Sequence, residues 1–505
     1  MFKASRHICK EDLVASRFRN VAVAALLLNL PLAACGDDDD SGHDHDSVTA
    51  HGGSGGSSGR TSTGGSGGSG TKAGSGGSVS SAGGAGGSGG SGTKAGAGGA
   101  GGRVSAGGAG GSVGGSGGSG GAAGEAGEAG APSEPNADAV YAVVTQLSSS
   151  EESLAYLKTV TALAPQPIDL KDAREFTGGA DAWSWNGFVY VSEQEKMTIT
   201  KFKLEGNELK EQGKVNFTDY GVTELAFWLN AFISPTKAWV VHGTAEYIAW
   251  NPETMKITGT VKMPELAARG AMRPYASYTD RSTAVRDGLF YHPIYYTIGG
   301  DDYFSFDAAT SIAVYDVKTD ALVKVIEAPC PGIDHVTQNE AGDLFFSAWV
   351  FAPGGAALLK QPSTCVAKIA KGADTATELF KVKDLTGGLE GGVLRYTGGG
   401  KALIAVLDPS HAPEADLSDV SAVAWGDNWK FWTYDFETNK AALIENDVIG
   451  WNSGAAYGTV VDGKSYLLVG TGDTSGTTLF DMTKPAEAKS LFTIEGWAMR
   501  LIKLR

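Results

Sequence analysis

The chain has 505 residues, of which 42% are hydrophobic and 9% aromatic, and its formal net charge is −16 at pH 7. All eleven tryptophans follow residue 134, and the residues from 135 onward hold 46 of the 57 acidic and 32 of the 41 basic side chains, a net charge of −14. A domain this acidic is a poor partner for nucleic acid or for an anionic membrane surface, so we expect no nucleic-acid binding.

The first 34 residues have the pattern of an export signal. Basic residues between Lys3 and Arg19 precede an apolar run at 21–32, which is too short to span a bilayer but suits the core of a signal peptide. The run ends in Leu32-Ala33-Ala34-Cys35, which resembles the lipobox of bacterial lipoproteins. This resemblance implies cleavage before Cys35, acylation of Cys35 and anchoring in a lipid bilayer. The alternative is an ordinary secretory signal followed by an unrelated cysteine.

Residues 35–134 form a low-complexity segment of mostly Gly, Ser and Ala. Such a segment buries too little apolar surface to offset its chain entropy, so we expect a disordered tether. His43, His45 and His51 lie near its start among aspartates. They offer at most weak, adventitious binding of Zn²⁺ or Cu²⁺, and they predict no firm metal site.

Residues 135–505 contain a repeated pattern. A short apolar strand follows a turn residue at intervals of about 50 to 60 residues, and further strand-like segments flank each copy. Four strands per repeat at this period are typical of a β-propeller. We therefore predict an all-β fold, a seven-bladed β-propeller of four-stranded blades. The seven copies lie at 138–144, 186–192, 236–242, 287–292, 342–347, 400–406 and 463–469.

The two ends of the repeat region also support a closed ring. The copy at 138–144 has only the tether before it, whereas the segment 496–505 is surplus after the seventh copy. Placing 496–505 as the innermost strand of the first blade closes the ring and removes both free edges. An eight-stranded sandwich with decorations, the alternative fold, explains neither the period nor the surplus strand.

Two cysteines remain if Cys9 is lost with the signal and Cys35 is acylated. An exported protein can keep a disulfide, and the remaining pair, Cys330 and Cys365, favours one. Two unpaired core cysteines are the alternative.

Long connections are expected on one face of the ring. The insertions at 293–310, 348–364 and 408–429 fall between second and third strands, and the connection at 265–281 reaches the same face. Arginines among aromatic rings suit a planar anionic ligand through forked hydrogen bonds and stacking. In the alternative interpretation the aromatic side chains pack together as a cap over the blades. The candidate ligand-binding residues are Arg273, Tyr275, Arg281, Tyr295, Tyr296, Trp349, Trp425 and Trp429.

The starts of the inner strands place a second set of polar residues at the mouth of the axial channel. A ring of carboxylates there could hold Ca²⁺ or another divalent cation, or could form a hydrated acidic funnel. No paired-histidine or C-x-x-C spacing predicts a metal centre, and no catalytic residues are assigned. The axial candidates are Asp181, Glu224, Asp334, His335, Glu390 and Arg395.

The lipobox at 32–35, the Gly/Ser/Ala tether and the diverged seven-bladed ring together resemble the myxobacterial lipoproteins encoded beside the genes for the siderophore myxochelin. This resemblance implies a surface-exposed outer-membrane lipoprotein that supports uptake of iron or another metal, beside an outer-membrane transporter. Its ligand would be small and anionic, such as a ferric siderophore, and we expect a monomer. An exported propeller enzyme, most plausibly a lactonase-like hydrolase, and a protein-interaction platform are the alternatives, and we favour a protein that is not an enzyme.

Overall fold

The computed structural model describes residues 139–148, 153–222, 230–242, 246–277, 280–299, 304–446, 449–453, 457–470 and 475–505. The expected signal peptide, the acylated Cys35, the tether with His43, His45 and His51, and the axial candidate Glu224 lie outside these residues. Within the described part of the chain, no helix is both long and apolar enough to cross a membrane.

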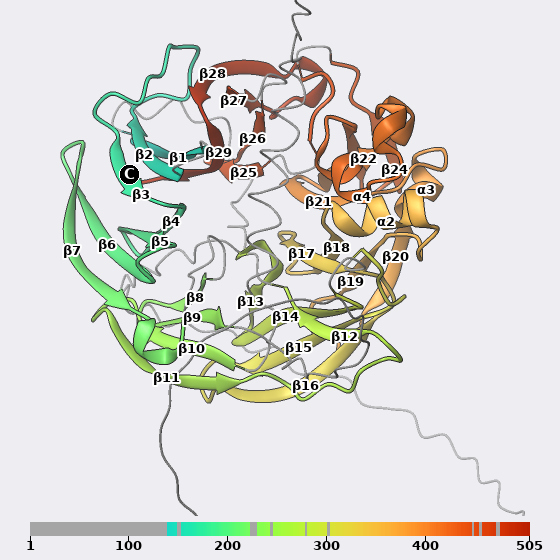
Figure 1. Cartoon of the computed structure of the whole chain (residues 1–505), viewed down its shortest axis with the longest axis horizontal. Coiled ribbons are helices and arrows are strands. Elements are labelled where there is room, and N and C mark those ends of the chain that lie inside the picture. The colour runs from blue at the N-terminus through green and yellow to red at the C-terminus, as the bar shows by residue number, and fades with distance from the viewer. Residues whose placement is uncertain are drawn as a thin grey trace, which may run out of the picture. The chain divides into compact units, whose positions relative to one another are not determined.

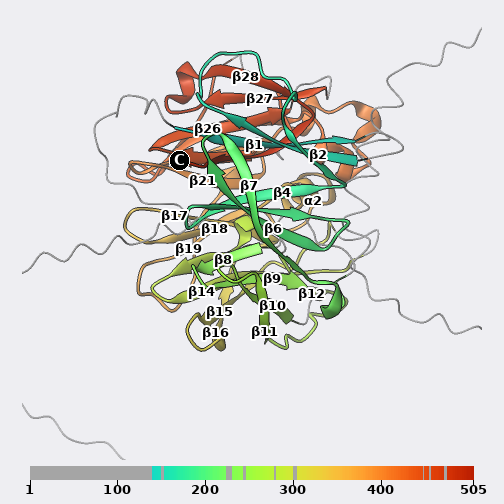
Figure 2. The ribbon, with the colours of Figure 1, turned by 90° about the vertical axis from the view of Figure 1, so that its left-hand side faces the viewer.

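Seven antiparallel sheets form a ring, which confirms the predicted seven-bladed β-propeller (Figure 1). Six sheets have four strands, and the fourth has an additional short strand. Second and third strands are buried on both faces because neighbouring blades cover them, as in β5, Phe188–Glu193, where five of six residues are buried. Outermost strands expose one face to solvent, as in β7, Glu208–Asn216, which lies toward the viewer in Figure 2.

The blades follow one another in chain order, each running from an inner to an outer strand. The first blade consists of β29 (Trp497–Lys503), β1 (Tyr141–Ser148), β2 (Ser153–Val160) and β3 (Arg174–Thr177). The second consists of β4 (Ala180–Trp185), β5, β6 (Thr198–Glu205) and β7. The third consists of β8 (Asn230–Ser234), β9 (Lys237–His242), β10 (Glu246–Asn251) and β11 (Lys256–Lys262). The fourth blade consists of β12 (Arg273–Ala276), β14 (Leu289–Thr297), β15 (Thr310–Asp316) and β16 (Ala321–Ala328), and the short strand β13 (Ala284–Arg286) also pairs with β14. The fifth consists of β17 (Ile333–Gln338), β18 (Leu344–Ala348), β19 (Cys365–Ile369) and β20 (Thr377–Lys381). The last two are β21 (Gly391–Gly398), β22 (Lys401–Leu407), β23 (Trp429–Asp435) and β24 (Lys440–Leu443); and β25 (Tyr457–Val461), β26 (Lys464–Gly470), β27 (Gly476–Asp481) and β28 (Lys489–Glu495).

The surplus C-terminal segment closes the ring, as predicted. Strand β29 is the innermost strand of the first blade and pairs with β1, with Lys503 opposite Tyr141. Beyond the strand, the backbone N–H of Leu504 donates to the carbonyl of Val140 at 2.8 Å. The first blade therefore joins the two ends of the propeller, and β29 covers the edge of β1 that faces the axis.

Two of the long connections carry helices that pack together. Helix α2 (Phe351–Leu359) follows β18, and α4 (Val420–Trp425) follows β22. A Cβ on Gly354 would lie 3.1 Å from Val420 Cγ1, so the glycine permits the close approach of the two helices. We call α2 and α4 the cap. The remaining short helices are η1 (Thr218–Tyr220), η2 (Asp280–Ser282), α3 (Val382–Leu385), η4 (Pro409–His411), η5 (Glu414–Asp416) and η6 (Pro485–Glu487).

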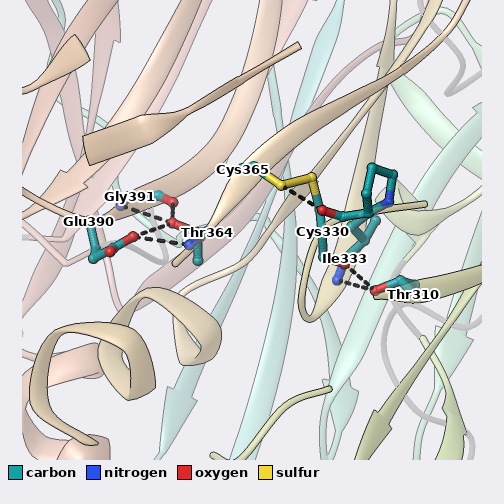
Figure 3. Close-up of a disulfide and its surroundings, with 8 residues drawn as sticks. Thr310, Cys330, Ile333, Thr364, Cys365, Glu390 and Gly391 are labelled. Atoms are coloured by element: carbon teal, nitrogen blue, oxygen red, sulfur yellow. Dashed lines mark hydrogen bonds between the residues drawn. A yellow bond between two sulfur atoms is a disulfide. The ribbon is translucent and has the colours of Figure 1, made fainter. Parts of the chain in front are cut away.

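A buried disulfide joins Cys330 to Cys365, with a Cα–Cα distance of 5.4 Å (Figure 3). The carbonyl of Cys330 accepts a hydrogen bond from Thr310 Oγ1 at 2.9 Å, and the same hydroxyl accepts from the backbone N–H of Ile333 at 3.2 Å. The bridge spans 35 positions in sequence, and closing a loop of that length contributes about 4 kcal/mol to stability. The disulfide and Thr310 together hold the turn that leads into β17.

Candidate functional site

A chamber lies on the axis of the ring, at the end where the inner strands begin. Its empty volume is ≈ 450 Å³, part of which is open to solvent. Strands β4, β17, β21, β25 and β29, together with η2 and the residue after β18, supply its walls, so six of the seven blades contribute. The lining residues are Asp181, Arg281, Asp334, His335, Trp349, Val393, Arg395, Tyr457, Met499 and Arg500.

An ion pair within the lining links the closing strand to the second blade. Arg500 Nε donates to Asp181 Oδ1 at 2.7 Å, and Arg500 Nη2 donates to Asp181 Oδ2 at 2.5 Å. Asp181 is 1% exposed, and its Oδ1 also accepts from the backbone N–H of Ala182 at 2.7 Å. This forked arrangement engages both carboxylate oxygens, so Asp181 serves chiefly to hold Arg500.

Two further arginines approach the start of β25. The guanidinium carbon of Arg281 lies 4.5 Å from the ring centroid of Tyr457, and its Nη2 donates to the carbonyl of Met499 at 3.4 Å. A Cβ on Gly458 would lie 2.6 Å from Arg395 Cδ, so the glycine leaves room for the Arg395 stem. Burial, with a further contribution from the charge of Arg281, lowers the pKa of Arg395 to about 9. We call Arg281 and Arg395 the arginine pair.

Asp334 and His335, which we call the polar pair, are the second and third residues of β17. Burial raises the pKa of Asp334 well above its usual range, which favours the neutral carboxylic acid. Burial and the charges of the arginine pair lower the pKa of His335 well below its usual range, so this imidazole is neutral near pH 7. His335 is 7% exposed, and its Nδ1 has no hydrogen-bond partner among the described residues.

The described lining therefore carries an excess of positive charge. Three arginines and two aspartates line the chamber, and burial favours the neutral form of Asp334. The chamber is thus cationic within a domain whose net charge is −14. A low-dielectric site of this sign attracts anions more strongly than the surrounding surface does.

The structure brings four of the six axial candidates together. Asp181, Asp334, His335 and Arg395 line the chamber, whereas Glu390 does not. Glu390 Oε2 instead accepts from the backbone N–H and the hydroxyl of Thr364, at 3.0 and 2.8 Å (Figure 3).

The axial carboxylates that the structure describes, which exclude Glu224, do not form the ring that a Ca²⁺ site or an acidic funnel would require. Arg500 holds Asp181, Thr364 binds Glu390, and burial favours the neutral form of Asp334. Among the residues that the structure describes, no three His, Cys, Asp or Glu side chains lie close enough to share a metal ion.

The candidates from the long loops separate into two groups. Arg281 and Trp349 line the chamber, and Trp349 also packs against the cap, with its ring 5.1 Å from that of Trp425. The other six do not reach the chamber, and several have the packing expected of the alternative interpretation, a cap of aromatic side chains. Trp429 is fully buried, and Tyr296 is 3% exposed beneath the guanidinium of Arg269. The rings of Tyr275 and Tyr295 pack together with their centroids 5.3 Å apart, and Trp425 lies in the cap. Arg273 is exposed on β12.

Sequence reasoning missed Val393, Tyr457, Met499 and Arg500. The signal for Arg500 was present, because a basic residue in the middle of the ring-closing strand must lie near the axis. Tyr457 opens the inner strand β25, so the rule that predicts Asp181 near the axis applies to Tyr457 as well.

Comparisons with known proteins identify no family for the chain. No protein-family model matches the chain, and no curated protein matches it. Among solved structures it is similar to the periplasmic gluconolactonase of Pseudomonas aeruginosa, with 11% identity and a TM-score of 0.46 over 73% of this chain and 99% of that one. It is also similar to a putative 6-phosphogluconolactonase of Bacteroides fragilis, with 10% identity and a TM-score of 0.45 over 74% of this chain and 99% of that one. A mutant apocarotenoid oxygenase of Synechocystis has 10% identity and a TM-score of 0.43 over 73% of this chain and 93% of that one. With TM-scores below 0.5, these likenesses assign neither a family nor a function to the chain.

Proposed function

We propose that the protein is a lipoprotein on the surface of the outer membrane whose propeller binds a small anionic ligand in the axial chamber. The observation that carries the binding proposal is the excess of positive charge in that chamber, where three arginines meet two aspartates and burial favours the neutral form of one of them, Asp334. The location rests on the sequence of the first 35 residues, where a signal-like segment ends at Cys35 and the Gly/Ser/Ala tether begins.

The arginine pair is the part of the chamber that would hold the anion. The guanidinium of Arg500 already donates to both oxygens of Asp181. Arg281 and Arg395 lower the pKa of His335 together, and Arg281 lowers that of Arg395, as expected of like charges in a poorly solvated site. An anion between the two guanidinium groups offsets that repulsion and receives forked, charge-assisted hydrogen bonds.

A ferric siderophore is one ligand of this class, and its binding would support iron uptake beside an outer-membrane transporter. Catecholate and carboxylate oxygens would face the arginine pair. The chamber, rather than the outer loop surface, would be the point of contact, since Trp425, Trp429 and Tyr296 pack within the fold.

Isothermal titration of the full chain tests the proposal. The probes are phosphate, citrate, benzoate and a ferric tris-catecholate, with tetramethylammonium as a cation of opposite sign. We expect saturable binding of at least one anion, weakened about tenfold or more by Arg395→Met or Arg281→Met. The matched control is Arg273→Met, which removes an exposed arginine outside the chamber and should leave the affinity unchanged. Absence of binding by every anion, or loss of binding in the Arg273 variant alone, would overturn the proposal.

A hydrolase is the second candidate, and one observation favours it. His335 is a neutral imidazole whose Nδ1 has no hydrogen-bond partner in the described structure, and it faces arginines that could stabilise an oxyanion. Such a histidine could take a proton from water as it attacks a lactone carbonyl, whose ring oxygen then leaves. A pH-stat assay with a simple γ-lactone would detect acid release, and activity unchanged in His335→Leu would exclude this role.

A further inference from the structure

The chamber has an apolar half that an inorganic anion would not use. Trp349, Val393, Tyr457 and Met499 line it. The ring of Trp349 is fixed edge-on between Trp425 and Phe351, at centroid distances of 5.1 and 5.5 Å. The ring of Tyr457 packs against Trp497 at 5.7 Å and lies beneath the guanidinium of Arg281. We call Trp349 and Tyr457 the aromatic walls; two fixed rings beside a cavity recognise a flat or ring-shaped molecule.

The polar pair adds hydrogen-bonding groups without adding charge. A neutral imidazole offers one donor and one acceptor, and a neutral carboxylic acid offers a donor. Both residues follow Ile333, the first residue of β17, whose backbone N–H donates to Thr310 Oγ1 beside the disulfide. Their backbone is therefore held firmly, and a hydroxyl group is the ligand feature that suits such neutral partners.

We infer that the chamber takes a small hydroxylated ring carboxylic acid. The arginine pair holds the carboxylate, the aromatic walls flank the ring, and the polar pair hydrogen-bonds a ring hydroxyl. This inference rests on the proposed function, because it requires an anion between Arg281 and Arg395, and it adds the ring and the hydroxyl.

Titration of the full chain with five probes separates the parts of the inference. The probes are 2-hydroxybenzoate, benzoate, glucuronate, acetate and phosphate, so the ring is either aromatic or a sugar. We expect 2-hydroxybenzoate or glucuronate to bind about tenfold or more tightly than acetate and phosphate. If the ring is aromatic, 2-hydroxybenzoate should also bind more tightly than benzoate.

Variants then assign the roles. Arg395→Met should weaken binding of every acid about tenfold or more, whereas His335→Leu should remove only the advantage that the hydroxyl confers and leave benzoate binding intact. Trp349→Leu gives an independent measurement, because it should weaken the ring acids and leave acetate unchanged. Arg273→Met is the matched control, and thermal melts monitored by circular dichroism establish that each variant is folded.

The outcomes distinguish this inference from the proposal beneath it. If phosphate or acetate binds as tightly as the ring acids and depends on Arg395, the chamber is an anion site and the ring-acid inference is wrong. If no anion binds at all, both are wrong. If His335→Leu and Trp349→Leu leave every affinity unchanged, the assignment of the hydroxyl and of the ring fails.

Discussion

Replacing Arg500 by methionine should destabilise the propeller strongly, because it leaves a buried carboxylate without its counter-ion. The side chains of Arg500 and Asp181 are 11% and 1% exposed, and the two are joined by contacts of 2.7 and 2.5 Å. At a charge separation of about 4 Å and an effective dielectric constant of about 20, their attraction is about 4 kcal/mol. Removing one partner of a buried pair typically costs about 3–5 kcal/mol. We expect Arg500→Met to lower the free energy of unfolding by that amount.

Urea titration followed by tryptophan fluorescence measures this change. Asp181→Asn and the double variant Asp181→Asn/Arg500→Met complete a thermodynamic cycle. The double variant contains no buried charge at this position, so it should be within about 2 kcal/mol of the unaltered chain. Arg273→Met removes an exposed arginine and should change stability by no more than about 0.5 kcal/mol.

The result that would refute this reasoning is a double variant as unstable as Arg500→Met alone. The loss would then come from packing of the arginine stem and not from the stranded charge. A loss below about 1 kcal/mol in Arg500→Met would show that the pair is well solvated, contrary to its burial.

Two further predictions concern pH and the disulfide. Burial lowers the pKa of His292 from 6.5 to about 4, so between these pH values the unfolded chain binds a proton that the folded chain does not. The contribution of neutral His292 to the free energy of unfolding is therefore fully present above pH 6.5 and falls by about 3 kcal/mol as the pH is lowered to 4. Urea midpoints from pH 7 to pH 4 should therefore fall less in His292→Gln, and equal falls would contradict the assignment. Replacing Cys330 and Cys365 by alanine should cost about 4 kcal/mol and weaken any ligand contact made through His335, which follows the same turn; an unchanged melting temperature would argue against this.

The architecture was predictable from sequence because it repeats. Seven copies of one strand pattern define the blades, and the surplus segment after the seventh copy defines the closure between Tyr141 and Lys503. Both inferences need only the order of apolar and turn residues along the chain, and neither depends on which way an individual side chain points.

The site was predictable only in part, because side-chain direction depends on register. The start of an inner strand placed Asp181, Asp334 and His335 near the axis, and they do line the chamber. The same rule failed for Glu390, which turns to Thr364 in the neighbouring connection. A shift of one residue along a strand reverses the face on which a side chain lies, and composition alone does not define that register.

The ion pair between Asp181 and Arg500 could not be anticipated, because its partners are separated by 319 positions. Aromatic side chains were equally ambiguous. Trp349 and Trp425 both follow second strands, yet one lines the chamber and the other lies in the cap. Packing between two insertions decides the difference, and it is not visible in either insertion alone.

The position of β29 in the chain also affects when the protein can mature. This strand is the last of the propeller to be synthesised, yet it forms the inner edge of the first blade and carries Arg500 into the chamber. While the ribosome still holds these residues, β1 exposes the edge that β29 later covers, and the cationic site lacks one of its walls. Final assembly of both the ring and the site therefore requires that β29 has left the ribosome, and a chain that has lost this strand has an open edge available to other strands.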